Sequence, residues 1–160
     1  MHWEPVPVAD AALAMAYMAL GRNSEAVRVA SRGLEKSPDD QMLNMACGEA
    51  LFNLGHYSEA IEYLERALLN SPDQHRVHYL IAEAYLRSGR EEESIPHYQL
   101  VIEIRPNDFE AHMGLGNAYH ALGMMEEARG EYFKALEIRP DSRQAREALE
   151  YIAGVSESQM

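Results

Sequence analysis

The sequence repeats itself every 34 residues, and this period constrains the fold more than any other feature. Prolines, glycines and glutamates each recur four times at that spacing. These columns are Pro38, Pro72, Pro106 and Pro140; Gly21, Gly55, Gly89 and Gly123; and Glu25, Glu59, Glu93 and Glu127. Because unrelated columns share one period, the chain divides into units 7–40, 41–74, 75–108 and 109–142, preceded by an N-terminal extension, 1–6.

Each unit has the pattern of two amphipathic helices joined by a glycine turn. Apolar residues at i, i+4 and i+7 form a core stripe on the first helix. The stripe consists of Leu13, Cys47, Ile81 and Leu115, then Tyr17, Leu51, Tyr85 and Tyr119, then Leu20, Leu54, Ser88 and Leu122. Glycine favours the left-handed end of a helix, and proline cannot continue the second helix. We therefore expect four helical hairpins and no strands.

Small residues and aspartates add detail to this pattern. Small side chains occur on the facing sides of both helices, so the two helices of a unit can approach closely. They are Ala14, Gly48, Ala82 and Gly116, opposite Ala26, Ala60, Ser94 and Ala128. An aspartate follows each proline and is placed to cap the next helix. The candidate caps are Asp39 or Asp40, Asp73, Asp108 and Asp141.

The pattern resembles the tetratricopeptide repeat family, whose unit is a 34-residue helix–turn–helix. The resemblance covers residues 7–142 and rests on the period, the glycine, the small residues, the aromatic column and the proline. It implies an all-α, right-handed α-solenoid that acts as a non-catalytic scaffold for peptides or proteins. The sequence departs from the family in a column where a bulky residue is usual, which here holds Asp10, Asn44, His78 and His112.

Residues 143–153 are predicted to form a capping helix, since a solenoid end needs a polar outer face. Its inward side is expected to hold Ala145, Ala148, Leu149 and Ile152. Residues 154–160 are expected to form a disordered tail.

The first helices carry a second apolar face, opposite the core stripe, and five of the seven internal methionines lie on it. The resemblance places a partner-binding groove there. The groove residues are Met15, Met18, Met42, Met45, Glu49, Phe52, Arg76, Tyr79, Glu83, Leu86, Arg87, Met113, Asn117 and His120. Methionine suits surfaces that accept varied apolar partners, so we expect an apolar or amphipathic peptide or helix there, with some basic character.

Two alternatives remain for these side chains. The apolar ones could simply pack between neighbouring repeats. The acidic ones, Glu49, Glu83 and Glu110, could orient basic side chains of a ligand, or Glu83 could pair within its helix with Arg87. A chaperone-like role as a cofactor that holds the C-terminal carboxylates of heat-shock chaperones is not expected. Of the positions that hold such carboxylates in one subfamily, only Arg76 fits.

The first unit presents an unprotected apolar helix, because every residue from Ala11 to Leu20 is apolar or tyrosine. Three explanations stay open: the extension with Trp3 covers this helix, a second copy covers it in a homodimer, or the chain continues a longer repeat array. Candidate self-association residues are Trp3, Ala11, Ala12, Met15, Met18 and Ala19.

Composition excludes several functions. The formal net charge of −12 disfavours nucleic acid and anionic membranes as partners. The apolar run from Ala11 to Leu20 is too short to span a membrane, and the N-terminus lacks a basic leader. A single cysteine, Cys47, suits a reducing compartment, so a cytoplasmic location is expected. Histidines 75, 78 and 112 do not converge with Cys47 by spacing, and we expect no metal, cofactor or enzymatic activity.

Overall fold

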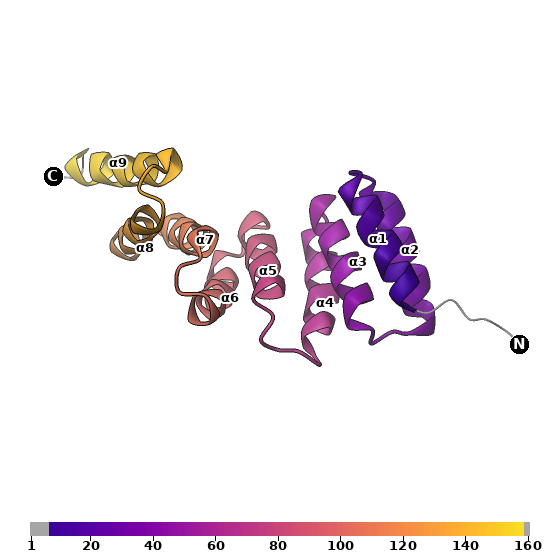
Figure 1. The fold of residues 1–160 in the computed structure, drawn as a ribbon. Helices are drawn as coiled ribbons and strands as arrows, with labels where there is room; N and C mark the ends of the chain where they lie inside the picture. The colour runs from indigo at the N-terminus through magenta and orange to yellow at the C-terminus, as the bar shows by residue number, and fades with distance from the viewer. Residues whose placement is uncertain (1–6, 159–160) are drawn as a thin grey trace, which may run out of the picture.

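The computed structural model describes residues 7–158, which form nine helices and no strands (Figure 1). The helices are α1 (Pro7–Ala19), α2 (Asn23–Lys36), α3 (Gln41–Asn53), α4 (Tyr57–Leu68), α5 (His75–Arg87), α6 (Glu91–Ile104), α7 (Phe109–Ala121), α8 (Met125–Ile138) and α9 (Arg143–Ser158). Each predicted unit contains one pair of them. The fold is an all-α, right-handed solenoid, as the sequence predicts.

Each helix packs on the one before it and the one after it along the chain. The first helices of successive units also touch, in the series α1, α3, α5 and α7. The helix directions turn progressively along the row, from the indigo N-terminal end to the yellow C-terminal end (Figure 1). The first helices therefore line one continuous inner side of the solenoid. Their residues that face away from the second helices form its concave surface.

The predicted turns and part of the predicted capping pattern are confirmed. All four turn glycines have positive φ, between 71° at Gly21 and 81° at Gly55, a conformation that costs other residues free energy. The side chains of Asp40 and Asp108 accept the predicted capping bonds from the backbone of α3 and α7. At α5 the N-cap is Gln74, which makes no side-chain capping bond. At α9 it is Ser142, rather than Asp141, that accepts from the backbone N–H of Ala145.

The small residues between paired helices are buried, as predicted. A Cβ atom added to Gly48 would lie 2.6 Å from Leu64 Cγ, and one added to Gly116 would lie 2.6 Å from Tyr132 Cε1. These distances are far shorter than a carbon–carbon contact allows. The lack of a side chain is therefore what lets a large residue of the second helix lie against the first helix.

The core stripe is only partly buried. Its first two rows are buried or half-buried in units two to four, whereas Leu13 is 41% exposed. The column of Leu13 faces the second helix of the preceding unit, as the approach of Cys47 Sγ to Ser31 Oγ at 3.9 Å illustrates. No such helix precedes α1 in the described chain. In the third row, Leu122 is half-buried, whereas Leu20, Leu54 and Ser88 are exposed beside the turns, so the prediction was wrong for these three.

The unusual polar column ties neighbouring units together. Asn44 Nδ2 donates to the carbonyl oxygen of Pro38, at 2.9 Å. His78 Nε2 and His112 Nε2 donate in the same way to Pro72 and Pro106, at 2.7 and 2.8 Å. All three side chains are buried. A buried polar group is costly unless it is hydrogen-bonded, so the proline carbonyl explains why polar residues are tolerated in this column.

The C-terminal helix is longer than predicted. Residues 154–158, expected to be disordered, continue α9 as far as Ser158, while 159–160 lie outside the described residues. The apolar side continues through Ile152, which is buried, and Val155, which is half-buried, so the extra turn has a surface to pack against. Among residues 7–158, no helix is both long enough and apolar enough to cross a membrane.

Candidate protein-interaction surface

The groove residues differ widely in their exposure. Met15, Met42, Arg76, Arg87 and Asn117 are exposed. Those that are half-buried are Met18, Met45, Glu49, Phe52, Tyr79, Glu83, Leu86 and His120. Met113 is an exception: it is only 3% exposed and belongs to a core cluster with residues of α8 and α9. The sequence-based placement of Met113 on the accessible groove is therefore wrong, because the capping helix adds apolar neighbours that the repeat pattern did not include.

The apolar part of the surface lies at its N-terminal end. Met15 on α1 and Met42 on α3 are 43% and 44% exposed, on the side of these helices away from the buried columns. Met45 and Phe52 are half-buried and pack against the core of units one to three. The deeper residues therefore support the fold, whereas Met15 and Met42 are the exposed apolar residues of the predicted groove.

The middle of the surface is organised by Arg87 at the end of α5. Its guanidinium carbon lies 5.2 Å from the centroid of the Phe52 ring, and Phe52 meets the ring of Tyr57 edge-on at 5.5 Å. A hydrogen bond with Tyr57 is the main cause that raises the pKa of Arg87. Arg87 therefore joins units two and three by a cation–π contact and fixes the position of the Phe52 ring.

The two groove carboxylates, Glu49 and Glu83, and the neighbouring Glu110 are held from within the chain. Glu49 accepts from Arg76 of the next unit, and Glu110 accepts from Arg139 Nη1 at 3.0 Å. Glu83 accepts from Arg87 Nε at 3.2 Å. Its other oxygen accepts from the buried Tyr98 hydroxyl at 2.6 Å. Burial is the largest cause that raises the pKa of Tyr98, and the charge and hydrogen bond of Glu83 raise it further. The hydroxyl therefore keeps its proton and stays a donor. The intrahelical pairing of Glu83 with Arg87 that the sequence left open is present.

A hollow of about 250 Å³ opens beside the start of α5. It is lined by His75, Arg76, Tyr79, Val101, Arg105, Asp108 and Glu110. Arg76 and Tyr79 come from the predicted groove, whereas Arg105 comes from the end of a second helix. Sequence reasoning missed Arg105 because it considered only first helices. A signal was available, since Arg105 and Arg139 repeat at the 34-residue period.

At the C-terminal end, the surface is polar and aromatic. Tyr132 donates its hydroxyl hydrogen to Asn117 Oδ1 at 2.8 Å, and burial raises the pKa of Tyr132 to about 12. His120 meets the ring of Tyr151 at 5.3 Å. Tyr151 lies on α9 and is exposed, so the capping helix extends the line of surface residues by one more helix.

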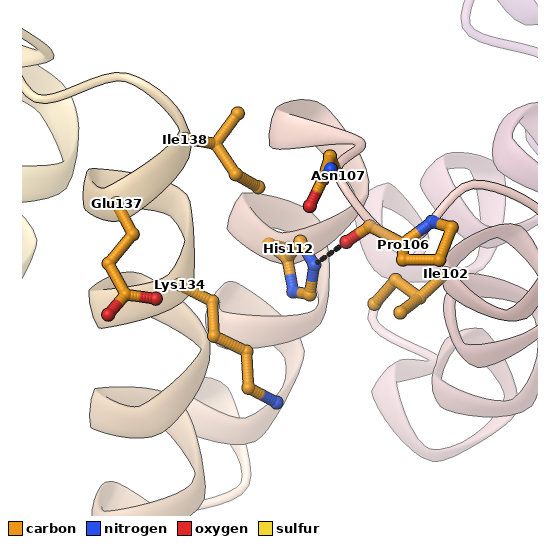
Figure 2. A pocket seen from close by; sticks show the side chains of 7 residues that line it. All are labelled: Ile102, Pro106, Asn107, His112, Lys134, Glu137 and Ile138. Carbon is orange, nitrogen blue, oxygen red and sulfur yellow. Dashed lines mark hydrogen bonds between the residues drawn. The ribbon is translucent and has the colours of Figure 1, made fainter.

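A second cavity, of about 570 Å³, contains no groove residue (Figure 2). Ile102 and Pro106 lie on one side of it and Lys134, Glu137 and Ile138 of α8 on the other, with His112 between them. Its strongest polar groups already have partners. His112 contacts Pro106 and Glu131, and Lys134 Nζ lies 3.0 Å from a Glu131 oxygen. This cavity is therefore a gap at the edge of the seam between units.

The predicted self-association residues are only partly accessible. Ala12, Met15 and Ala19 are exposed and Met18 is half-buried, but Ala11 is fully buried, so its assignment to an exposed edge is wrong. Ala11 belongs to the core of units one to three, on the packed side of α1. Trp3 lies outside the described residues.

The exposed edge of α1 corresponds to a face that is buried in the second unit. Ala9, Ala12, Leu13 and Ala16 are all exposed. The residues 34 positions later, Leu43, Ala46, Cys47 and Ala50, are at most 1% exposed. The edge of α1 thus has the composition of a buried seam.

Within the described part of the chain, no three His, Cys, Asp or Glu side chains are placed to hold a metal ion. Burial raises the pKa of the Cys47 thiol, which opposes formation of a reactive thiolate.

The helical hairpins, the turn glycines and the concave surface define a helical repeat protein of the solenoid class. Three family models, each described as tetratricopeptide repeat, match residues 7–47, 45–109 and 85–150. Together they cover most of the sequence, and the chain belongs to the tetratricopeptide repeat family.

Several solved structures share this fold. MamA from Desulfovibrio magneticus superposes with a TM-score of 0.89 at 20% identity, over 94% of this chain and 85% of that one. A second MamA structure, "MamA MSR-1 C2", has a TM-score of 0.84 at 25% identity, over 95% and 87%. The first tetratricopeptide domain of Spaghetti (RPAP3), bound to an HSP90 peptide, has a TM-score of 0.69 at 24% identity, over 72% and 91%. No curated protein sequence matches the chain.

Proposed function

We propose that this chain is a non-catalytic interaction scaffold that binds an apolar or amphipathic segment of a partner protein on its concave surface. The observation that carries the proposal is the exposure of Met15 and Met42 on the inner side, away from the buried columns. Flexible methionines on an open surface can adapt to different apolar side chains. The family, and a similar domain that holds a peptide, support the same kind of role.

The basic ligand character expected from sequence has lost its support. It depended on Glu49, Glu83 and Glu110, and each of these carboxylates is already bonded to an arginine of the same chain. The apolar or amphipathic character, extended or helical, remains part of the proposal. A cytoplasmic location also remains part of it, on the evidence of the buried and unpaired Cys47.

The test is a double variant, Met15→Glu with Met42→Glu, compared with Met124→Glu. Met124 is exposed to a similar degree but lies at the N-cap of α8, away from the groove residues. Proteins retained by the wild type are identified by mass spectrometry, and the affinity of each purified candidate is measured for all three proteins. A groove partner should bind at least about tenfold more weakly to the double variant, since two carboxylates would be placed in an apolar contact. Equal binding by all three proteins would place the interaction elsewhere.

A second function, self-assembly through the first unit, is favoured by the exposed edge of α1. An apolar helix face with the composition of a buried seam is a candidate interface with a second copy. Leu13→Lys would place a charge at its centre, and Leu69→Lys is the control at an exposed leucine elsewhere. Sedimentation velocity should show dimers for the wild type and the control and monomers for Leu13→Lys. A wild-type monomer at high micromolar concentration would exclude this function.

A further inference from the structure

In two ion pairs of the concave surface the arginine is more exposed than its carboxylate, whereas in the third, Arg139 and Glu110 are equally exposed, at 54% and 53%. In the pair of Arg76 with Glu49, the arginine side chain is 64% exposed and the glutamate 19%. In the pair of Arg87 with Glu83, the values are 53% and 14%. Each guanidinium lies over a carboxylate that is largely shielded. A guest therefore meets positive charge at these positions, although the chain as a whole carries a net charge of −12.

The same inequality occurs in the hollow beside α5. The Arg105 side chain is 56% exposed, and that of Asp108 is 18% exposed. Arg105 Nη1 donates to His75 Nε2 at 3.0 Å, so its bonded acceptor is an imidazole nitrogen. The closest approach to Asp108 is 3.8 Å, which is too long for a hydrogen bond. Because a guanidinium carries five N–H donors, Arg105 keeps donor capacity available in the hollow.

The two carboxylates of the hollow each already accept one hydrogen bond. Asp108 Oδ1 accepts from the backbone N–H of Ala111 at 3.0 Å and so serves to cap α7. Glu110 accepts from Arg139, whose guanidinium also stacks 4.1 Å from the centroid of the Phe109 ring. The hollow thus offers donors on Arg76 and Arg105, beside the half-buried Tyr79 ring, while its exposed carboxylate, Glu110, is paired with the equally exposed Arg139.

We infer that this hollow binds the side-chain carboxylate of an Asp or Glu residue in the guest. The guest of the concave surface is then an acidic and apolar peptide, whose apolar side chains contact Met15 and Met42 and whose carboxylate reaches Arg76 and Arg105. Arginine is suited to this because its planar donors match a carboxylate in a bidentate way. The inference rests on the proposed function, and it replaces the basic ligand expected from sequence with an acidic one.

The net negative charge of the chain does not oppose this assignment at short range. At physiological ionic strength the screening length is about 8 Å, so a bound carboxylate responds mainly to the guanidinium groups beside it. A lysine at the same position would be repelled by Arg76 and Arg105 and attracted mainly by Glu110, whose charge is already paired with Arg139. The hollow should therefore bind a guest carboxylate more tightly than a guest ammonium group.

The experiment is a selection from a display library of random 12-residue peptides on three immobilised proteins. They are the wild type, the double variant Arg76→Gln with Arg105→Gln, and the control Arg129→Gln. Arg129 is similarly exposed and also pairs with a glutamate, Glu126, but lies on α8 outside the hollow. Peptides enriched on the wild type and on the control should be apolar and should carry more Asp and Glu than Lys and Arg. On the double variant the apolar residues should remain and the acidic excess should disappear.

One enriched peptide and its Glu→Gln or Asp→Asn version are then compared by fluorescence anisotropy. The neutral version should bind the wild type about fivefold more weakly, as expected for a partly exposed charge pair, and should bind the double variant as well as the acidic version does.

An excess of basic residues, the absence of any charge preference, or a preference that survives in the double variant would each overturn the inference. In those cases the proposed function would still stand if the selected apolar peptides lose binding to the Met15→Glu and Met42→Glu variant. A library that yields no binding peptide would overturn both.

Discussion

His112 donates a hydrogen bond from each ring nitrogen, and both acceptors are oxygen atoms. Nε2 lies 2.8 Å from the carbonyl oxygen of Pro106, and Nδ1 lies 2.6 Å from a carboxylate oxygen of Glu131. Only the doubly protonated imidazolium can donate to both. In the unit before, His78 donates from Nε2 to Pro72, but its Nδ1 faces the Nδ1 of His97 at 3.0 Å. That pair needs no charge, because a neutral His97 can donate to a neutral His78.

The ion pair of His112 with Glu131 should make its largest contribution to stability in mildly acidic solution. The hydrogen bond to Glu131 raises the pKa of His112, so its contribution is complete below about pH 6.5 and is lost as pH rises through the raised value. Burial opposes ionisation of Glu131, but its bonds with His112 and Lys134 lower its pKa. The contribution of Glu131 is therefore lost only in stronger acid.

His112→Gln should accordingly lower the midpoint of urea unfolding more at pH 5.5 than at pH 8.5. His56→Gln, at an exposed histidine beside Glu59, is the control and should show little difference. A larger loss for His112→Gln at pH 8.5 than at pH 5.5 would contradict the imidazolium assignment.

The His78 and His97 pair should respond to acid in the opposite direction. Burial, with a smaller effect of His78, lowers the pKa of His97 to about 4. Between pH 6.5 and pH 4 the unfolded chain therefore binds a proton that the folded chain does not bind. Stability decreases as the pH is lowered across that range. The other aromatic neighbour of His97 is Tyr85, whose ring centroid lies 5.8 Å from that of His97 and which is uncharged in this pH range.

His97→Gln removes this titration, so its thermal midpoint should fall less than that of the wild type between pH 6.5 and pH 4. Parallel curves for the two proteins would show that His97 is protonated in the folded state.

Gly114→Ala should destabilise the protein by about 1–3 kcal/mol, because the added methyl group would overlap the ring of Tyr98. Tyr98 is fully buried, and its hydroxyl is bonded to Glu83, so the ring has no simple way to move. Gly130→Ala is the matched control, since an added Cβ there meets nothing within 4 Å. That change should stabilise α8 by up to about 1 kcal/mol through helix propensity. Chemical denaturation of both variants measures the difference, and equal effects would mean that the close approach at Gly114 is not rigid.

Asp40→Ala should cost about 1 kcal/mol, because Asp40 accepts the capping bond from the backbone N–H of Leu43 at 2.9 Å. Gln74→Ala, at the equivalent position before α5, should cost much less, since Gln74 makes no capping bond with its side chain. Thermal unfolding of the two variants provides the comparison. A loss at Gln74 as large as that at Asp40 would indicate that the side-chain bond is not what stabilises the start of these helices.

The fold follows from the sequence because its determinants are local and repeated. A turn glycine at Gly21 or Gly123 ends the helix before it, and Asp40 or Asp108 caps the helix that follows it. Two of the errors occur at the ends of the array. Leu13 lacks the preceding helix that buries Cys47, and Met113 gains neighbours from α8 and α9.

The surface was predicted less well than the fold, for a related reason. Helical periodicity shows which side of α5 holds Arg76 and Tyr79, but it does not show that Arg105 reaches the same hollow from the end of α6. Nor does it show whether a charged side chain is paired. The pairing of Glu49 with Arg76 depends on the rotation between two neighbouring units, which no pattern within one unit encodes.

The bonds from Asn44, His78 and His112 to proline carbonyls each join one unit to the next by the same six-residue step. A gene that encodes residues 75–108 twice in succession would give the inserted histidine the carbonyl of Pro106 as its acceptor and would leave both ends of the solenoid unchanged. Such a protein would be one hairpin longer, with its concave surface extended by one more first helix. The bond to the proline carbonyl is thus one contact between units that an array lengthened by internal duplication would keep.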